Sequence, residues 1–193
     1  MNTKSSDPFA SRGFGGAALW LDFVNSELWD GYGNPTEMLE NPAWISSFLR
    51  FWNIRNSASA APVKRLKMLR AQLRQLVDNI GAGKRLRIED LTEINQWLKI
   101  PTIPQLEEHQ DGWRLVLRPY DRGWRVILAN IASSFAESLV EHEQKKLKIC
   151  ENTDCRWIFI DGSKNNVRRW CSDATCGNRD RVRRARAGGK SPR

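Results

Sequence analysis

The chain has 193 residues, of which 40% are hydrophobic and nine are tryptophans, so it can bury a core and is not disordered throughout. No segment approaches the roughly 18 apolar residues of a membrane span, and the first residues lack the apolar region of a signal peptide. These features predict a soluble cytoplasmic protein. The net charge of +9 is unevenly distributed, because residues 1–144 hold 17 basic and 17 acidic side chains, whereas residues 145–193 hold 14 and 5. The basic segment predicts a polyanionic partner, with a solvated tail as the alternative.

The first part of the chain reads as a helical domain over residues 15–145, after a flexible leader over residues 1–14. Apolar residues at helical spacing predict a helix that includes Leu21, Val24 and Leu28. The pair Asn41-Pro42 has the form of a helix start, because proline suits the first turn. This second helix is expected to continue through Trp52.

Four further elements follow before the cysteines. Leucines every three or four residues predict an amphipathic helix over 63–80 that ends at Gly81, with lysines and arginines on its other face. A shorter helix over 88–98 is expected to end before Pro101. Alternating residues on either side of Asp111-Gly112 predict a β-hairpin. A long helix is then expected from near residue 121 to near residue 143.

All four cysteines lie in the last quarter of the chain, with the pattern C-x4-C-x15-C-x4-C. Two symmetric pairs are typical of a tetrahedral four-thiolate zinc site, which is structural because no coordination position remains for a reactive water. Disulfides would require an oxidising compartment, and a redox or iron–sulfur site fits this spacing less well. We therefore predict one structural Zn²⁺, bound by Cys150, Cys155, Cys171 and Cys176.

The zinc module is expected to span residues 146–187, followed by a disordered tail over 188–193. The 15-residue spacer predicts a hairpin of RWIFID and VRRW, joined by a turn at 162–165 and packed by Trp157, Phe159 and Trp170. A helix should begin near Gly177, with Val182 and Ala185 packed on this hairpin. Asn178 should then face inward and hold the cysteine turn. The fold class is thus mainly α with a small β-hairpin (α+β), comprising a helical N-terminal domain and a zinc-binding hairpin-helix module.

Arginines crowd this module, and in the expected helix they face outward, repel one another and require an anion. Such a helix suits double-stranded DNA, through phosphate or groove contacts. An RNA- or ribosome-associated binder would use the same cations. A zinc-stabilised interaction module, with the arginines solvated beside a dimer contact, is the third alternative. The candidate DNA-binding residues are Arg168, Arg169, Arg179, Arg181, Arg183, Arg184 and Arg186.

Few other residues suggest a site. Asp22 and Asn25 are polar residues in an apolar helix and could line a small-molecule pocket, although buried hydrogen bonding is the favoured role. His109 and His142 are isolated and expected on the surface. Because no phosphate-binding loop, nucleophile elbow or metalloprotease motif is present, we expect no enzyme activity. A homodimer and a small-molecule effector are compatible with the helical domain.

The run RRWC-x4-CGNR, preceded by C-x4-C and the aromatic segment WIFID, resembles the CGNR zinc finger. The N-terminal segment LWLDFVNS is similar to the LDFVNT segment of the ABATE domain that usually accompanies this finger, with Ser26 in place of threonine. Proteins of this type are described as stress-induced transcriptional regulators. The resemblance implies that the four cysteines bind zinc and that the CGNR region binds DNA. We accordingly expect a DNA-binding transcriptional regulator, associated with a bacterial nucleoid.

Overall fold

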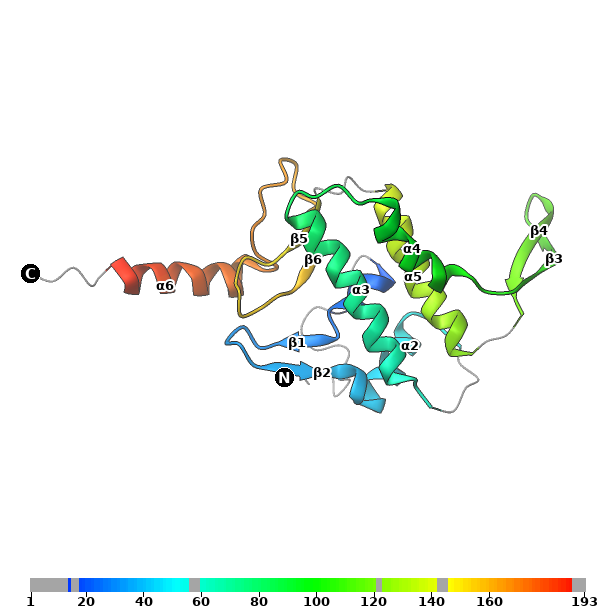
Figure 1. The fold of residues 1–193 in the computed structure, drawn as a ribbon, viewed down its shortest axis with the longest axis horizontal. Coiled ribbons are helices and arrows are strands. Elements are labelled where there is room, and N and C mark those ends of the chain that lie inside the picture. The colour runs from blue at the N-terminus through cyan, green and yellow to red at the C-terminus, as the bar shows by residue number, and fades with distance from the viewer. Residues whose placement is uncertain (1–13, 15–17, 56–59, 121–122, 142–145, 189–193) are drawn as a thin grey trace, which may run out of the picture.

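The computed structural model describes residues 14, 18–55, 60–120, 123–141 and 146–188. It confirms the α+β class, because helices form most of the chain and the strands pair only as three antiparallel hairpins. In Figure 1 the helices form the centre of the molecule, the hairpin of β3 and β4 extends from one end, and helix α6 extends from the other. None of the described helices is long and apolar enough to cross a membrane.

Most of the main core comes from helices α1 (Leu19–Val24), α2 (Pro42–Phe51), α3 (Val63–Gly81) and α5 (Trp124–Glu141). Trp20, Phe23 and Trp44 are fully buried there, and the ring of Trp20 meets that of Phe135 edge to face, with centroids 5.0 Å apart. Each fully buried side chain of this kind contributes roughly 1.5–3 kcal/mol. This core holds the elements that position the cysteine module.

The prediction that the first helix extends to Leu28 is wrong, because the helix ends at Val24. Helix α1 ends there, and the chain turns into β1 (Glu27–Trp29), where Leu28 pairs with Thr36 of β2 (Pro35–Glu37). The loop between these strands contains Gly31 and Gly33 at φ +83° and +93°, which other residues adopt with strain. The Asp30 carboxylate accepts hydrogen bonds from the backbone N–H groups of this loop. Helical spacing alone did not reveal this turn.

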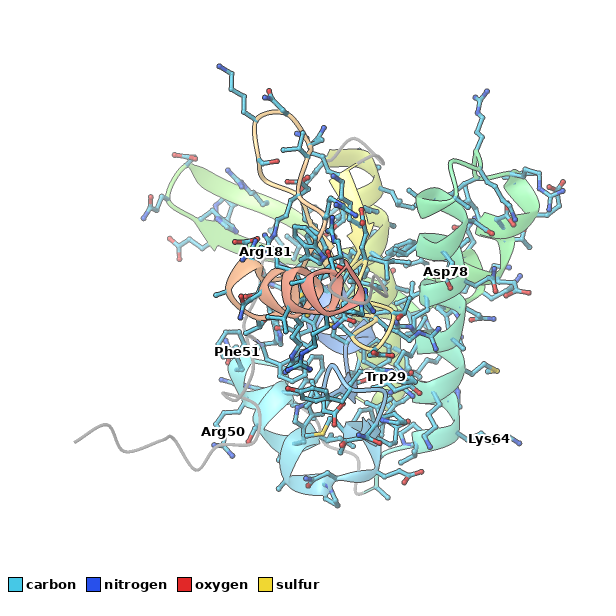
Figure 2. The ribbon with its side chains drawn as sticks, turned by 90° about the vertical axis from the view of Figure 1, so that its left-hand side faces the viewer. Trp29, Arg50, Phe51, Lys64, Asp78 and Arg181 are labelled. Atoms are coloured by element: carbon cyan, nitrogen blue, oxygen red, sulfur yellow. The ribbon has the colours of Figure 1, made fainter. Side chains whose placement is uncertain are left out.

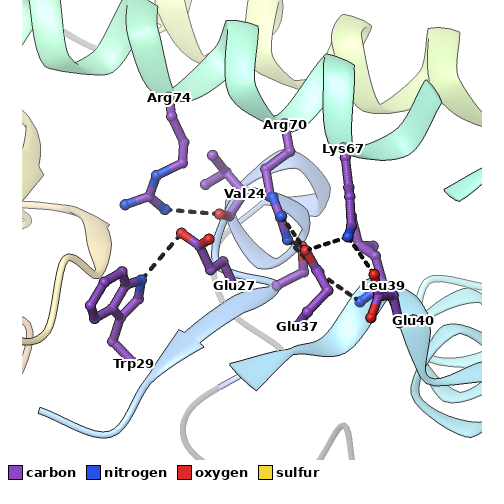
Figure 3. Close-up of polar contacts among 10 residues, drawn as sticks. Val24, Glu27, Trp29, Glu37, Leu39, Glu40, Lys67, Arg70 and Arg74 are labelled. Atoms are coloured by element: carbon purple, nitrogen blue, oxygen red, sulfur yellow. Dashed lines mark hydrogen bonds and ion pairs between the residues drawn. The ribbon is translucent and has the colours of Figure 1, made fainter. Parts of the chain in front are cut away.

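The next two predicted helices are confirmed. A one-turn helix η1 (Met38–Glu40) precedes α2, which begins after Asn41, whose side chain accepts hydrogen bonds from the N–H groups of Ala43 and Trp44. Helix α3 ends at Gly81 as expected. The expectation that its cations all lie on the solvent face is wrong for Arg70, which is 6% exposed and makes a bidentate ion pair with Glu37. Figure 3 shows this pair beneath α3.

The central prediction of a helix, a hairpin and a helix is also confirmed. Helix α4 (Ile88–Leu98) precedes β3 (Thr102–His109) and β4 (Gly112–Pro119), which form the expected antiparallel hairpin, with His109 paired to Gly112. His109 is exposed at the end of β3, as expected. Helix α5 follows, while its expected limits near residues 121 and 143, and His142, lie outside the described residues.

The prediction that RWIFID and VRRW pair as a hairpin between the two cysteine pairs is wrong. Strand β6 (Ile158–Ile160) pairs with β5 (Leu147–Ile149), which precedes the first cysteine, rather than with the segment VRRW. Leu147 and Ile158 belong to the main core, beside α3 and α1. Strand pairing therefore follows burial of the apolar residues in LKI and IFI, whereas two of the four residues in the predicted partner strand are arginines. The last described elements are a short π-helix, η3 (Asp173–Gly177), and α6 (Asn178–Gly188), which follows it directly.

Candidate zinc centre and basic helix

The four cysteine side chains converge from two turns. Cys150 follows β5 and Cys155 precedes β6, while Cys171 and Cys176 flank the start and end of the segment that leads to α6. All four Sγ atoms lie within 4.8 Å of one another, and none forms a disulfide. The Sγ atom of Cys171 is 3.6 Å from that of Cys155 and 3.7 Å from that of Cys176. Zinc–sulfur bonds of about 2.3 Å in a tetrahedron require separations of about 3.8 Å, so the residues fit one Zn²⁺.

The surroundings of the thiols also suit a cation. Three of the four cysteines are buried, and the group packs with Phe159, Trp157 and Trp170. Hydrogen bonds from Cys155 and Cys171 lower the pKa of Cys150, and donating these hydrogen bonds raises the pKa values of Cys155 and Cys171. A bound Zn²⁺ would stabilise all four thiolates together.

Asn152, rather than Asn178, is the asparagine that supports the cluster. Its buried side-chain nitrogen lies 3.7 Å from the Sγ atom of Cys176 and can donate a hydrogen bond to it. Asn178 is exposed at the start of α6, so the expectation that it faces inward is wrong. Helix α6 is rotated about its axis relative to the prediction, because the π-helix η3 that precedes it has about one residue more per turn than an α-helix.

Gly177 is required for space. A Cβ atom at this position would lie 2.5 Å from Oδ1 of Asp173 and 3.2 Å from a ring carbon of Trp170. Gly177 is buried directly after the ligand Cys176, so a larger residue there would require the Asp173 side chain and the Trp170 ring to shift. The glycine therefore permits close packing of η3 against the aromatic wall of the cluster.

A buried carboxylate organises the spacer between the cysteine pairs. Asp161 is fully buried and pairs with Lys148 at 2.7 Å, and it accepts hydrogen bonds from the backbone N–H groups of Ser163 and Arg168. Burial would raise the pKa of Asp161, but these hydrogen bonds outweigh it and hold the pKa well below the usual range. This network replaces the strand pairing that the sequence suggested, and alternation patterns do not reveal it.

Asp22 and Asn25 are both 1% exposed and have protein partners. The indole N–H of Trp52 donates to Asp22 at 3.1 Å. Asn25 bonds twice to the backbone of Ile158 in β6. The polar atoms of these residues therefore serve internal hydrogen bonds, the favoured role, and Asn25 connects the helical domain to the cysteine module.

Arg179, which was expected to begin the outward face of α6, instead contacts the loop between β1 and β2. Its Nη1 atom donates to the carbonyl oxygen of Asp30 at 3.2 Å, and its guanidinium lies 4.4 Å from the ring centroid of Tyr32. The absence of a side chain at Gly31 permits this approach, because a Cβ there would lie 1.8 Å from Nη1. The first turn of α6 is thereby anchored to the helical domain.

The other arginines are exposed but do not simply repel one another. Asp180 pairs with Arg183 and Arg184, three and four residues along the helix, and Asp173 pairs with Arg181. The expectation of an unpaired cationic face is therefore wrong for these three. Among the described residues, Arg186 has no acidic partner. Val182 is 42% exposed and Ala185 is exposed, so neither packs on the hairpin as expected.

The remaining two candidates lie beside the cysteines rather than on α6. Arg168 lies over the ring of Phe159 and donates to the carbonyl oxygens of Trp170 and Cys171. Arg169 pairs with Glu151 and lies over Trp170. Both side chains thus also contribute to the packing of the cysteine module.

Two family models match the chain. Residues 17–142 match the ABATE family, described as "Putative stress-induced transcription regulator". The chain belongs to the ABATE family. Residues 146–188 match the CGNR zinc finger, so the four-cysteine cluster is the metal site of that finger. The chain is therefore a zinc-finger member of a family of transcription regulators, and neither description names a catalytic activity. No curated protein matches the chain.

With these matches, the ABATE domain corresponds to the helical body and the CGNR finger to the cysteine module. The regular spacing of the four cysteines in the sequence predicted the zinc ligands. The sequence patterns did not predict the roles of Asn152 and Asp161, which support the cluster. They also did not predict that Arg74 donates to the carbonyl oxygens of Val24 and Arg156. Of these three residues, only Asn152 could have been predicted from the sequence, because asparagine commonly supports tight turns.

Proposed function

We propose that this zinc-containing regulator binds double-stranded DNA through α6. The supporting observation is the position of α6, which extends away from the ABATE domain (Figure 1) while Cys176 anchors its preceding turn in the cluster. The helix carries five arginines and one aspartate. Figure 2 views the molecule from this end, with Arg181 labelled on the helix. A polyanion is the ligand that such a helix attracts most strongly.

The pairing with Asp180 is compatible with this role. The side chains of Arg183 and Arg184 remain 56% and 58% exposed, and that of Asp180 is 12% exposed. Exposed ion pairs typically contribute under about 1 kcal/mol, so phosphate oxygens can replace the aspartate. The aspartate then serves to hold the arginines in position while no DNA is bound.

The exposed amide of Asn178 extends the proposed interface. An asparagine side chain can form two hydrogen bonds with adenine in the major groove, whereas arginine contacts guanine or phosphate. We propose Asn178 as a base contact and Arg183, Arg184 and Arg186 as phosphate or base contacts. Arg168, Arg169, Arg179 and Arg181 would contribute mainly by holding the finger and its helix in place.

The test is binding of fluorescently labelled duplex DNA to the zinc-loaded protein, measured by anisotropy at several salt concentrations. We expect affinity to fall steeply as salt rises. The double variant Arg183→Ala/Arg186→Ala should bind about tenfold or more weakly, and the slope of log affinity against log salt should decrease by about 2. Its urea midpoint should match that of wild type, because both side chains are exposed.

The matched control is Arg55→Ala/Arg85→Ala, which removes two exposed arginines from the ABATE domain. It should bind DNA within about twofold of wild type, since charges farther than a Debye length of about 10 Å are screened. Salt-independent binding, or equal losses in the two double variants, would refute the proposed interface. Tighter binding of a matched RNA would favour the RNA-associated alternative. A large loss of stability in the α6 variant would indicate a structural role.

A further inference from the structure

A cleft of about 700 Å³ lies between the ABATE domain and the zinc finger. One wall comes from β1 and its loop, including Leu28 and Trp29, and the opposite wall comes from the finger, including Trp157 and Phe159. Trp29 is labelled in Figure 2, which views the molecule from the end where α6 lies. Small-molecule sites typically have volumes of about 300–1,000 Å³ and mainly apolar walls with few polar groups. The cleft meets both criteria.

Two guanidinium groups border this cleft, from Arg168 and Arg179. Within the described part of the chain neither has a carboxylate partner, since both donate to carbonyl oxygens and lie over aromatic rings. Asp30 is the one carboxylate among the described residues of the lining, and its oxygens accept hydrogen bonds within its own loop. Among the described residues, two positive charges and one carboxylate therefore border a largely apolar cleft, and neither guanidinium forms an ion pair with that carboxylate.

The zinc ligands determine which end of the cleft suits an anion. Three of the zinc ligands, Cys155, Cys171 and Cys176, border it on the finger side, and a four-thiolate Zn²⁺ centre carries a net charge of −2. An acidic group would be repelled there. The guanidinium of Arg179, held beside Asp30 and Tyr32 on the β1 side, offers the favourable position.

We propose that this cleft binds a small aromatic carboxylate. Its ring would lie among Trp29, Trp157 and Phe159, and its carboxylate would accept hydrogen bonds from Arg179. Aromatic walls favour a planar ligand through offset or edge-to-face contacts, and guanidinium groups bind carboxylates in a bidentate manner. The inference does not depend on DNA binding, although Arg179 belongs to the first turn of α6 and would couple the ligand to that helix.

The test uses the zinc-loaded full chain and isothermal titration without nucleic acid. The probes are benzoate, indole-3-carboxylate and 2-naphthoate, each compared with its neutral amide. We expect at least one acid to bind with a Kd below about 1 mM, and its amide to bind about tenfold more weakly because it lacks the charge-assisted hydrogen bonds. Arg179→Gln should remove the preference for the acid over the amide.

Two variants test the location. Trp29→Ala removes one aromatic wall, and Thr175→Phe fills the cleft from an exposed position on η3. Each should weaken binding about tenfold, as expected for loss of a stacking contact or of space. Trp113→Ala, at a 69% exposed position on β4 and outside the cleft lining, is the matched control and should bind as wild type does.

Each outcome of these titrations tests either the location of the site or the role of Arg179. If none of the acids binds below about 1 mM, or if Thr175→Phe binds as tightly as wild type, the proposed site is wrong. Equal affinities for acid and amide would overturn the role of Arg179. Circular dichroism checks each variant, and if Trp29→Ala does not fold, the exposed Thr175→Phe decides the location. Because no DNA is present, failure of the DNA-binding proposal leaves this result unaffected.

Discussion

Asn25 of the ABATE domain and Ile158 of the zinc finger form a reciprocal pair of hydrogen bonds. The Asn25 Nδ2 atom donates to the Ile158 carbonyl oxygen at 2.9 Å, and Oδ1 accepts from the Ile158 N–H at 2.9 Å. Both residues are almost completely buried. Because an amide side chain offers one donor and one acceptor, it satisfies both backbone groups of Ile158 that face away from β5. The finger is thus bonded directly to the LDFVNS segment.

Replacing Asn25 by alanine should destabilise the whole protein, not only the finger. The backbone N–H and C=O of Ile158 would remain buried without partners, at a cost of about 2–4 kcal/mol. Urea unfolding of the zinc-loaded protein measures this change. Asn95→Ala, at an exposed position of α4, is the matched control and should shift the midpoint little. A loss no larger than the control's would contradict the structural role of this pair.

Removing zinc should unfold residues 146–188 and weaken the ABATE domain as well. The cluster alone has few apolar side chains, so without the metal the thiols and the surrounding turns lack a stabilising centre. Leu147 and Ile158 would then leave the main core. Mass spectrometry should find one zinc per chain, and chelation should reduce helical circular dichroism and lower Tm. Cys171→Ser should reproduce this loss, whereas an unchanged Tm after chelation would argue against a structural metal.

The ion pair of buried Arg70 with partly buried Glu37 should contribute pH-dependent stability. Burial raises the pKa of Glu37, but hydrogen bonds from Arg70 and the Leu39 N–H, with nearby positive charges, lower it overall. A lowered folded-state pKa stabilises the protein above the unfolded value, near 4.5, and this contribution is lost as pH falls through the folded-state pKa. The stability difference between wild type and Glu37→Gln should therefore be largest near pH 7 and shrink below about pH 4.5.

Arg70→Ala tests the same pair from its other side. Removing one partner leaves a partly buried carboxylate, which should cost about 2–4 kcal/mol at pH 7. The control is Arg118→Ala on β4, whose ion pair with Glu107 lies on the projecting hairpin and should affect unfolding little. Comparable urea midpoints for the two variants would show that the ion pair of Arg70 with Glu37 stabilises the fold no more than an exposed ion pair does.

Gly177→Ala should impair the second cysteine turn. The added Cβ would meet Asp173 and Trp170 at separations shorter than van der Waals contact, and such overpacking typically costs about 1–3 kcal/mol. We expect a lower Tm and faster release of zinc to a chelator. Gly162→Ala is the matched control, because a Cβ there meets no atom within 4 Å. Equal zinc release from the two variants would refute the packing role of Gly177.

Local patterns in the sequence determined much of this protein. The apolar spacing of α2, α3, α4 and α5, together with Asn41 and Gly81 at helix ends, identifies those helices, because capping and amphipathic burial act over neighbouring residues. The paired spacing of the cysteines identified the metal ligands for the same reason. Each pair lies in one turn, and four thiolates have few alternative uses in such an arrangement.

The tertiary structure decided where individual polar side chains lie. Arg70 and Arg179 have the same chemistry as the exposed arginines, yet one is buried against Glu37 and the other contacts the Asp30 loop. Strand β6 pairs with β5 and receives Asn25 from 133 residues earlier in the chain. These outcomes depend on partners distant in sequence, since a side chain's burial and hydrogen bonds are determined only when the elements pack together. The zinc ligands could thus be identified from spacing, whereas the attachment of the finger to the ABATE domain could not.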